Sequence, residues 1–134
     1  MATIGEAARR SGVNIETIRY YERSGVVPCP ARGTNGRRDY SEADIRRLTF
    51  IRRCRDMGFA LADARRLASL TADLRANCAD AQAVAETHLA TVRTRLAELR
   101  AIEAELAALV QDCARRGRPC PVLEKLEEGP GKPG

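Results

Sequence analysis

Two cysteines bracket a short loop near the C-terminal end of the 134-residue chain. Cys113 and Cys120 are separated by six residues that include Gly117 and Pro119, and both of these residues favour a turn. This spacing lets two thiolates converge on one ion while the loop closes over it. The spacing is longer than the CxxC of a zinc ribbon, so the pair taken alone also fits two incidental thiols.

A third cysteine lies at the other end of an uninterrupted helical segment. Residues 79–112 contain neither glycine nor proline, which predicts one long helix with Cys78 at its start and Cys113 at its end. These two cysteines are 35 residues apart, or about 52 Å along a helix, which is too far to share an ion within one chain. In an antiparallel pair of such helices they can meet. Each site would then combine Cys78 of one subunit with Cys113 and Cys120 of the other.

Three thiolates form a soft donor set, which favours soft metal ions. No histidine or carboxylate is placed to complete a tetrahedron, so the set suits a large divalent ion such as Hg(II), Pb(II) or Cd(II). Zn(II) would need a fourth ligand, either water or Asp112. Three arginines in the loop would offset the negative charge of the thiolates and lower their pKa values. These are Arg115, Arg116 and Arg118.

Redox sensing is the alternative chemistry for the cysteines. Residues 1–13 carry charges where a secretion signal needs an apolar core, and no run of about 18 apolar residues exists, so a cytoplasmic protein is expected. In that compartment the five cysteines indicate metal or redox groups rather than a disulfide framework. A redox sensor would use a disulfide between Cys113 and Cys120 and would have no need of Cys78.

Three other residues with chemically active side chains are not expected to bind metal. Cys54 falls on an apolar helical stripe, which predicts a small buried residue. Cys29 stands between two prolines in a turn, and His88 lies about 15 Å along the helix beyond Cys78. His88 is the single histidine of the chain, and no nucleophile–base arrangement accompanies it, so an enzyme is the least expected class.

The long helix carries an apolar seam that needs a partner. Its apolar residues recur at steps of four and three, with charges on the other faces, which is typical of a coiled coil. A second copy of the chain is the expected partner, giving a two-fold dimer. The alternative is a helix folded back onto residues 1–70. The seam residues are Val92, Leu96, Leu99, Ile102, Leu106 and Leu109.

The first half of the chain is basic. Residues 1–70 contain 14 Lys and Arg against 8 Asp and Glu, whereas residues 71–134 contain 9 against 10. A compact, arginine-rich half suggests a polyanionic partner, and double-stranded DNA is the expected one. The alternative is a basic surface that only keeps the protein soluble and binds no polyanion.

Capping residues divide this half into short helices. Thr3 with Glu6, and Asn14, predict two helices that end at Gly12 and Gly25, which is the helix-turn-helix pattern. The segment 28–40 excludes a helix and predicts a short hairpin with a basic tip, as in a DNA-binding wing. Ser41 with Asp44 predicts a third helix, and a fourth is expected over residues 61–70.

The expected fold is therefore mainly α, in four parts. A winged helix-turn-helix DNA-binding domain would cover residues 1–70, and a linker with a dimerisation helix would cover residues 71–112. A metal-binding loop and short helix would follow over residues 113–127, and a disordered tail over residues 128–134.

Several runs of sequence together resemble the MerR family of metal-responsive regulators. The resemblance covers nearly the whole chain, and the combined motif is highly specific. The runs are residues 4–8 (IGEAA), 12–25 (GVNIETIRYYERSG), 36–40 (GRRDY) and 50–59 (FIRRCRDMGF).

The resemblance implies a winged helix-turn-helix, an antiparallel coiled-coil dimer and a C-terminal metal loop. It also implies Cys78, Cys113 and Cys120 as ligands, and a cysteine at the first of these positions is typical of the divalent sensors of the family. The loop length resembles the cadmium and lead regulators, whereas residues 14–16 look more like the mercury regulators. The resemblance therefore leaves the metal open.

The family mechanism would be activation by DNA distortion. A dimer on an inverted repeat would bend the promoter without metal, and would kink and underwind it with metal, so that RNA polymerase engages both promoter elements. By the same resemblance, Thr17, Arg19 and Tyr20 would contact the major groove, and Arg38 and Tyr40 would hold backbone phosphates. The residues alone do not decide whether Tyr20 or Tyr21 faces DNA.

Overall fold

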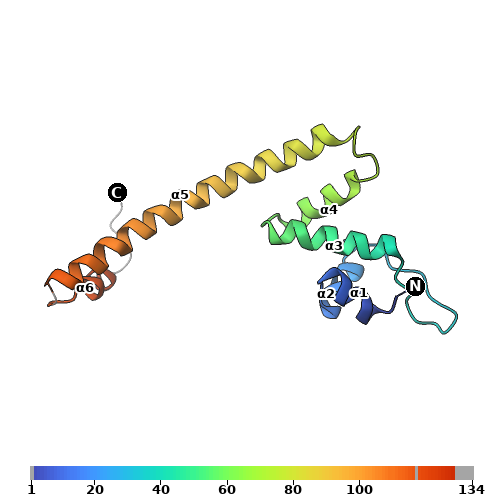
Figure 1. The fold of residues 1–134 in the computed structure, drawn as a ribbon, viewed down its shortest axis with the longest axis horizontal. Coiled ribbons are helices and arrows are strands. Elements are labelled where there is room, and N and C mark those ends of the chain that lie inside the picture. The colour runs from blue at the N-terminus through green and yellow to red at the C-terminus, as the bar shows by residue number, and fades with distance from the viewer. Residues whose placement is uncertain (1, 117, 129–134) are drawn as a thin grey trace. The chain divides into compact units, whose positions relative to one another are not determined.

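A computed structural model describes residues 2–116 and 118–128 as a mainly helical chain (Figure 1). The chain divides into two compact units, Met1–His88 and Leu89–Gly134, with the boundary inside the longest helix. The helices are α1 (Ile4–Ser11), α2 (Ile15–Arg23), α3 (Glu42–Asp56), α4 (Leu61–Leu70), α5 (Cys78–Arg116) and α6 (Pro121–Glu127).

Side-chain caps set the starts of the first three helices, as the sequence predicts. The Thr3 hydroxyl accepts from the Glu6 N–H at 3.2 Å, and the Asn14 side chain accepts from the Thr17 N–H at 2.8 Å. Ser41 and Asp44 form the predicted capping box, in which each side chain accepts from the backbone N–H of the other. Each cap satisfies an N–H that has no partner within the helix.

The core of the first unit forms around α3. Helix α3 packs against α1 on one side and α4 on the other, and α1 contacts α2. Ile18 of α2 and Leu48 and Ile51 of α3 are almost fully buried, and Cys54 joins them as the apolar stripe predicts. Val84, in the second turn of α5, is also buried in this core, so the start of the long helix folds with the first unit.

The segment between α2 and α3 is a loop closed by two isolated bridges. Ala2 pairs with Tyr40 and Arg32 pairs with Arg38, both antiparallel, and no regular strand forms in the described residues. The two sides of the predicted hairpin therefore pair at Arg32 and Arg38, but the paired segment is too short to form regular β-strands. Gly36 adopts a left-handed φ of 78° at the tip, where a side chain would be strained.

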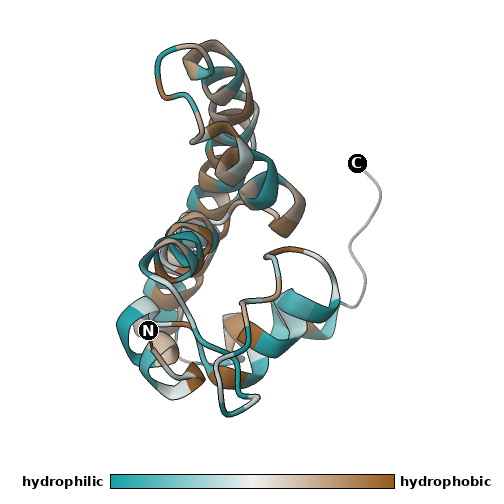
Figure 2. Ribbon diagram, turned by 90° about the vertical axis from the view of Figure 1, so that its right-hand side faces the viewer, coloured by the Kyte–Doolittle hydropathy of each residue, from teal (hydrophilic) through white to brown (hydrophobic). Residues whose placement is uncertain are grey.

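The second unit consists of the remainder of α5 with α6. The predicted long helix is confirmed as one continuous element of 39 residues. Hydrophobic residues recur along α5 among hydrophilic ones (Figure 2), and several of them are exposed in the single chain. No helix within the described residues is long and apolar enough to cross a membrane. Of the predicted disordered tail, residues 129–134 lie outside the described residues.

Candidate functional site

One face of α2 presents polar side chains to solvent. Arg19 and Tyr20 are exposed and Thr17 is half-buried, whereas Ile18 and Tyr21 point into the core. Tyr20 is 51% exposed against 8% for Tyr21. Tyr20 is the tyrosine available to a partner, and Tyr21 is a core residue.

The loop after α2 adds arginines next to this face. A cavity of about 630 Å³ lies between the start of α1, the end of α2 and the loop. The Arg32 guanidinium donates to the Gly36 carbonyl oxygen at 2.9 Å, which braces the tip of the loop. Five arginines line the cavity, which makes it suited to an anionic ligand such as a phosphate backbone. They are Arg19, Arg23, Arg32, Arg37 and Arg38.

A buried carboxylate ties this loop to α2. The side chain of Glu22 is only 1% exposed. It accepts a hydrogen bond from the Tyr40 hydroxyl at 2.5 Å and forms an ion pair with Arg38. The Glu22 charge raises the pKa of Arg38, and burial raises the pKa of Tyr40. The three side chains thus fix the position of the loop relative to α2.

Glu22 is not among the residues predicted from the sequence, and Tyr40 was expected to contact a phosphate. Tyr40 is 2% exposed, with its hydroxyl turned to Glu22, so its role as a phosphate contact stays a prediction. A signal for Glu22 existed in the sequence, because it lies four residues after the buried Ile18 and therefore on the inner face of α2.

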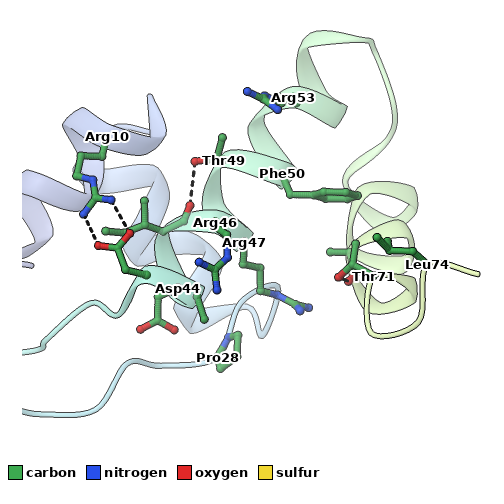
Figure 3. Close-up of a pocket in the computed structure, with 14 residues that line it drawn as sticks. Arg10, Pro28, Asp44, Arg46, Arg47, Thr49, Phe50, Arg53, Thr71 and Leu74 are labelled. Carbon is green, nitrogen blue, oxygen red and sulfur yellow. Dashed lines mark hydrogen bonds and ion pairs between the residues drawn. The ribbon is translucent and has the colours of Figure 1, made fainter. Parts of the chain in front are cut away.

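A larger cavity, about 920 Å³, lies along α3 (Figure 3). On one side Arg10 pairs with Glu42 at 2.6 Å, and on the other the Phe50 ring faces Thr71 and Leu74 (Figure 3). Arg46, Arg47 and Arg53 add positive charge to its lining. None of the residues that the sequence selects for DNA or metal binding lines this cavity.

The structure brings two of the three predicted metal ligands together. The sulfur atoms of Cys113 and Cys120 are 3.7 Å apart, and both residues are half-buried. Cys113 stands in the last turn of α5, and Cys120 directly precedes α6. The Leu123 N–H and the Cys113 thiol lower the pKa of Cys120. Two soft donors at this separation fit a soft metal ion.

Cys78 is exposed at the first residue of α5, in the other compact unit. In the part of the chain that the structure describes, no cluster of three or more Cys, His, Asp or Glu side chains could hold an ion. Cys54 is buried, and burial raises the pKa of its thiol, whereas Cys29 is exposed. A single chain therefore presents a pair of cysteines and a separate exposed one.

The lowered pKa of Cys120 predicts a reactive thiol. Because thiolate is the species that alkylates, labelling of Cys120 by iodoacetamide should reach its half-maximal rate below the pH of about 8.5 that an ordinary cysteine requires. Peptide mass spectrometry across a pH series measures this rate for Cys120 alone. Cys113→Ser replaces one of the groups that lower the pKa of Cys120, so the midpoint should move toward the ordinary value in this variant. In the unmodified protein, a midpoint at the ordinary value would contradict the assignment.

Comparison with known proteins identifies the architecture. Residues 2–71 match the family described as MerR HTH family regulatory protein, and residues 45–109 match the family described as MerR, DNA binding. The HTH-type transcriptional regulator HmrR of Rhizobium leguminosarum bv. viciae is 41% identical over 94% of this chain and 98% of its own length. The mercuric resistance operon regulatory protein of Serratia marcescens is 38% identical over 93% of this chain and 87% of its own.

A solved structure agrees with these sequence matches. The transcription regulator PbrR691 of Ralstonia metallidurans CH34, determined in complex with lead(II), superimposes with a TM-score of 0.74. It is 39% identical, and the superposition covers 94% of this chain and 99% of that one. The matched helix-turn-helix, the long helix that follows it and the two family matches lead to one conclusion: this chain belongs to the MerR family of transcription regulators.

Proposed function

We propose that the protein is a metal-responsive transcription regulator that binds an operator as a dimer and senses a soft divalent ion through cysteine thiolates. The 3.7 Å approach of the Cys113 and Cys120 sulfur atoms carries the proposal, because it gives a DNA-binding chain a preformed pair of soft ligands. The names of similar proteins support the same class of ion, since one is a mercuric resistance regulator and another was crystallised with lead(II).

The third ligand would come from a second subunit. Cys78 begins α5 and Cys113 lies in its last turn, so an antiparallel pairing of two α5 helices would bring Cys78 of one chain to the cysteine pair of the other. Exposed apolar side chains along α5 support such a pairing, because burying them needs a partner surface. They include Leu89, Leu96, Leu99, Ile102, Leu106 and Val110, which are 44% to 64% exposed.

The proposed DNA interface combines α2 with the loop that follows it. Thr17, Arg19 and Tyr20 would enter the major groove from the exposed face of α2. Arg38 would approach a backbone phosphate with its half-exposed guanidinium while Glu22 holds its other side. Tyr40 would contribute to phosphate binding chiefly by fixing Glu22, since its own hydroxyl is buried.

In this proposal the metal adds binding free energy that differs between two shapes of the dimer. Cys78, Cys113 and Cys120 would hold the ion, which supplies the link between subunits. The two DNA-binding units would then hold the promoter in a different conformation, and sequence-dependent deformability of DNA would convert this change into access for RNA polymerase. The chain's own part is to position the thiols and to transmit their displacement through α5.

A metal panel tests the proposal. The operator is first selected from random DNA by binding to the protein, and is then placed in a promoter for transcription with purified RNA polymerase. We expect activation by at least one of Hg(II), Pb(II) and Cd(II). Activation by Zn(II) should be weaker, because Zn(II) needs a fourth ligand. Activation by Cu(I) alone would contradict the divalent assignment. A response to oxidant with none to metal would favour the redox alternative based on Cys113 and Cys120.

A further inference from the structure

His88 connects the long helix to the turn between α3 and α4. Its Nε2 atom lies 2.8 Å from the carbonyl oxygen of Met57. A carbonyl oxygen only accepts, so Nε2 must carry the proton and donate. The ring of His88 also packs on that of Phe59, with ring centroids 4.2 Å apart and planes inclined by 31°. One side chain of α5 thus makes a hydrogen bond and a ring contact to the same turn.

The turn that receives His88 is firmly held. Phe59 is buried, its N–H donates to the Cys54 carbonyl oxygen at 3.1 Å, and its own carbonyl oxygen accepts from the Arg55 guanidinium at 2.7 Å. Gly58 has a left-handed φ of 87°, and a Cβ there would lie 3.4 Å from His88 Nε2. A displacement of His88 would therefore act on the end of α3, around which the core of the DNA-binding unit is built.

His88 is also the last residue of α5 that belongs to the first unit. Val84, one turn earlier, is buried in the core, whereas the boundary between the two compact units falls after His88. The helix continues without interruption across this boundary. A rigid helix passes a displacement along its length, and the residues that clamp it determine where the displacement is delivered.

We infer that His88 is a positioning residue that passes the metal-dependent displacement of α5 to the DNA-binding unit, through the Met57 carbonyl and the Phe59 ring. The inference rests on the proposed function, and it adds a residue that touches neither metal nor DNA. Its effect belongs to the coupling between the two sites, not to the affinity of either one. That property separates it from a residue that only stabilises the fold.

The test compares His88→Ala, which removes both contacts, with His88→Gln, whose amide N–H reaches about as far as Nε2 and keeps a donor for Met57. Arg95→Ala is the control, because Arg95 is exposed and lies two turns further along the same face of α5. For each full-length protein we would measure three quantities: Hg(II) affinity from thiolate-to-metal absorbance, operator affinity without metal, and the ratio of transcription with and without Hg(II).

For His88→Ala we expect an induction ratio about five- to tenfold below that of the unmodified protein, with both affinities within about twofold. His88→Gln should recover part of the ratio, and Arg95→Ala should match the unmodified protein. An unchanged ratio in His88→Ala would overturn the inference, as would a loss of metal-free operator binding that accounts for the whole effect. If the unmodified protein shows no response to metal, the proposed function itself is rejected, and the inference with it.

Discussion

Replacing Cys78 by serine is expected to weaken soft-metal binding by more than about 100-fold, since loss of a hydrogen-bond partner of a metal ligand already costs 10- to 100-fold. A serine hydroxyl is a hard donor that stays protonated near neutral pH, so it does not replace a thiolate on Hg(II) or Pb(II). Cys113 and Cys120 would remain as a two-sulfur site, 3.7 Å apart. Competition titration against a thiol chelator measures the change, and metal-dependent transcription should disappear with it.

Cys29→Ser is the matched control for this substitution. Cys29 is an exposed cysteine, as Cys78 is, but it lies in the loop between α2 and α3. Its replacement should leave metal affinity and induction unchanged. Full response in Cys78→Ser would contradict the three-thiolate site and would favour the redox alternative, in which Cys113 and Cys120 act without a third thiol.

Replacing Glu22 by alanine is expected to lower the free energy of unfolding by about 2 kcal/mol, because the buried Tyr40 hydroxyl loses its acceptor and Arg38 loses its counter-charge. The Arg38 side chain is 36% exposed and can turn to water, which keeps the loss below that of a fully buried pair. Operator affinity should also fall, since the loop that carries Arg32, Arg37 and Arg38 is no longer fixed to α2. Urea unfolding and DNA titration measure the two effects separately.

The control for this second substitution is Glu16→Ala, on the exposed surface of the same helix. Glu16 stands in the first turn of α2, where a negative charge contributes less than about 1 kcal/mol through the helix dipole. An equal loss of stability in Glu16→Ala and Glu22→Ala would contradict the role assigned to the buried carboxylate. Unchanged operator affinity in Glu22→Ala would show that the loop position does not depend on it.

Local signals in the sequence predicted the helices well. The capping side chains of Thr3, Asn14 and Ser41 each accept a hydrogen bond from a backbone N–H three residues later. The starts of α1, α2 and α3 could therefore be predicted from the sequence. Helix α5 could be predicted because no glycine or proline interrupts it. The approach of Cys113 to Cys120 also follows from local spacing, since only six residues separate them.

Contacts between distant residues could not be predicted in this way. Helical spacing places Glu22 on the inner face of α2 with Ile18, but the partners of its charge, Arg38 and Tyr40, lie 16 and 18 residues later and are known only from the fold. His88 meets a carbonyl 31 residues earlier in the chain, a contact that could not be read from its expected place on the surface or at an interface of the helix. The expected domain boundary after residue 70 stays a prediction, and the division between compact units falls after His88, since Val84 packs into the core.

Mixed dimers test the central claim, that the metal site is shared between subunits, most directly. One chain carries Cys78→Ser and the other carries Cys113→Ser with Cys120→Ser, so neither homodimer contains a complete three-thiolate site. In an antiparallel heterodimer, Cys78 of the second chain would meet Cys113 and Cys120 of the first. We therefore expect the purified heterodimer to bind one Hg(II) ion with the affinity of the unmodified protein, while both homodimers bind at least about 100-fold more weakly. A heterodimer that binds no better than either homodimer would contradict the shared site.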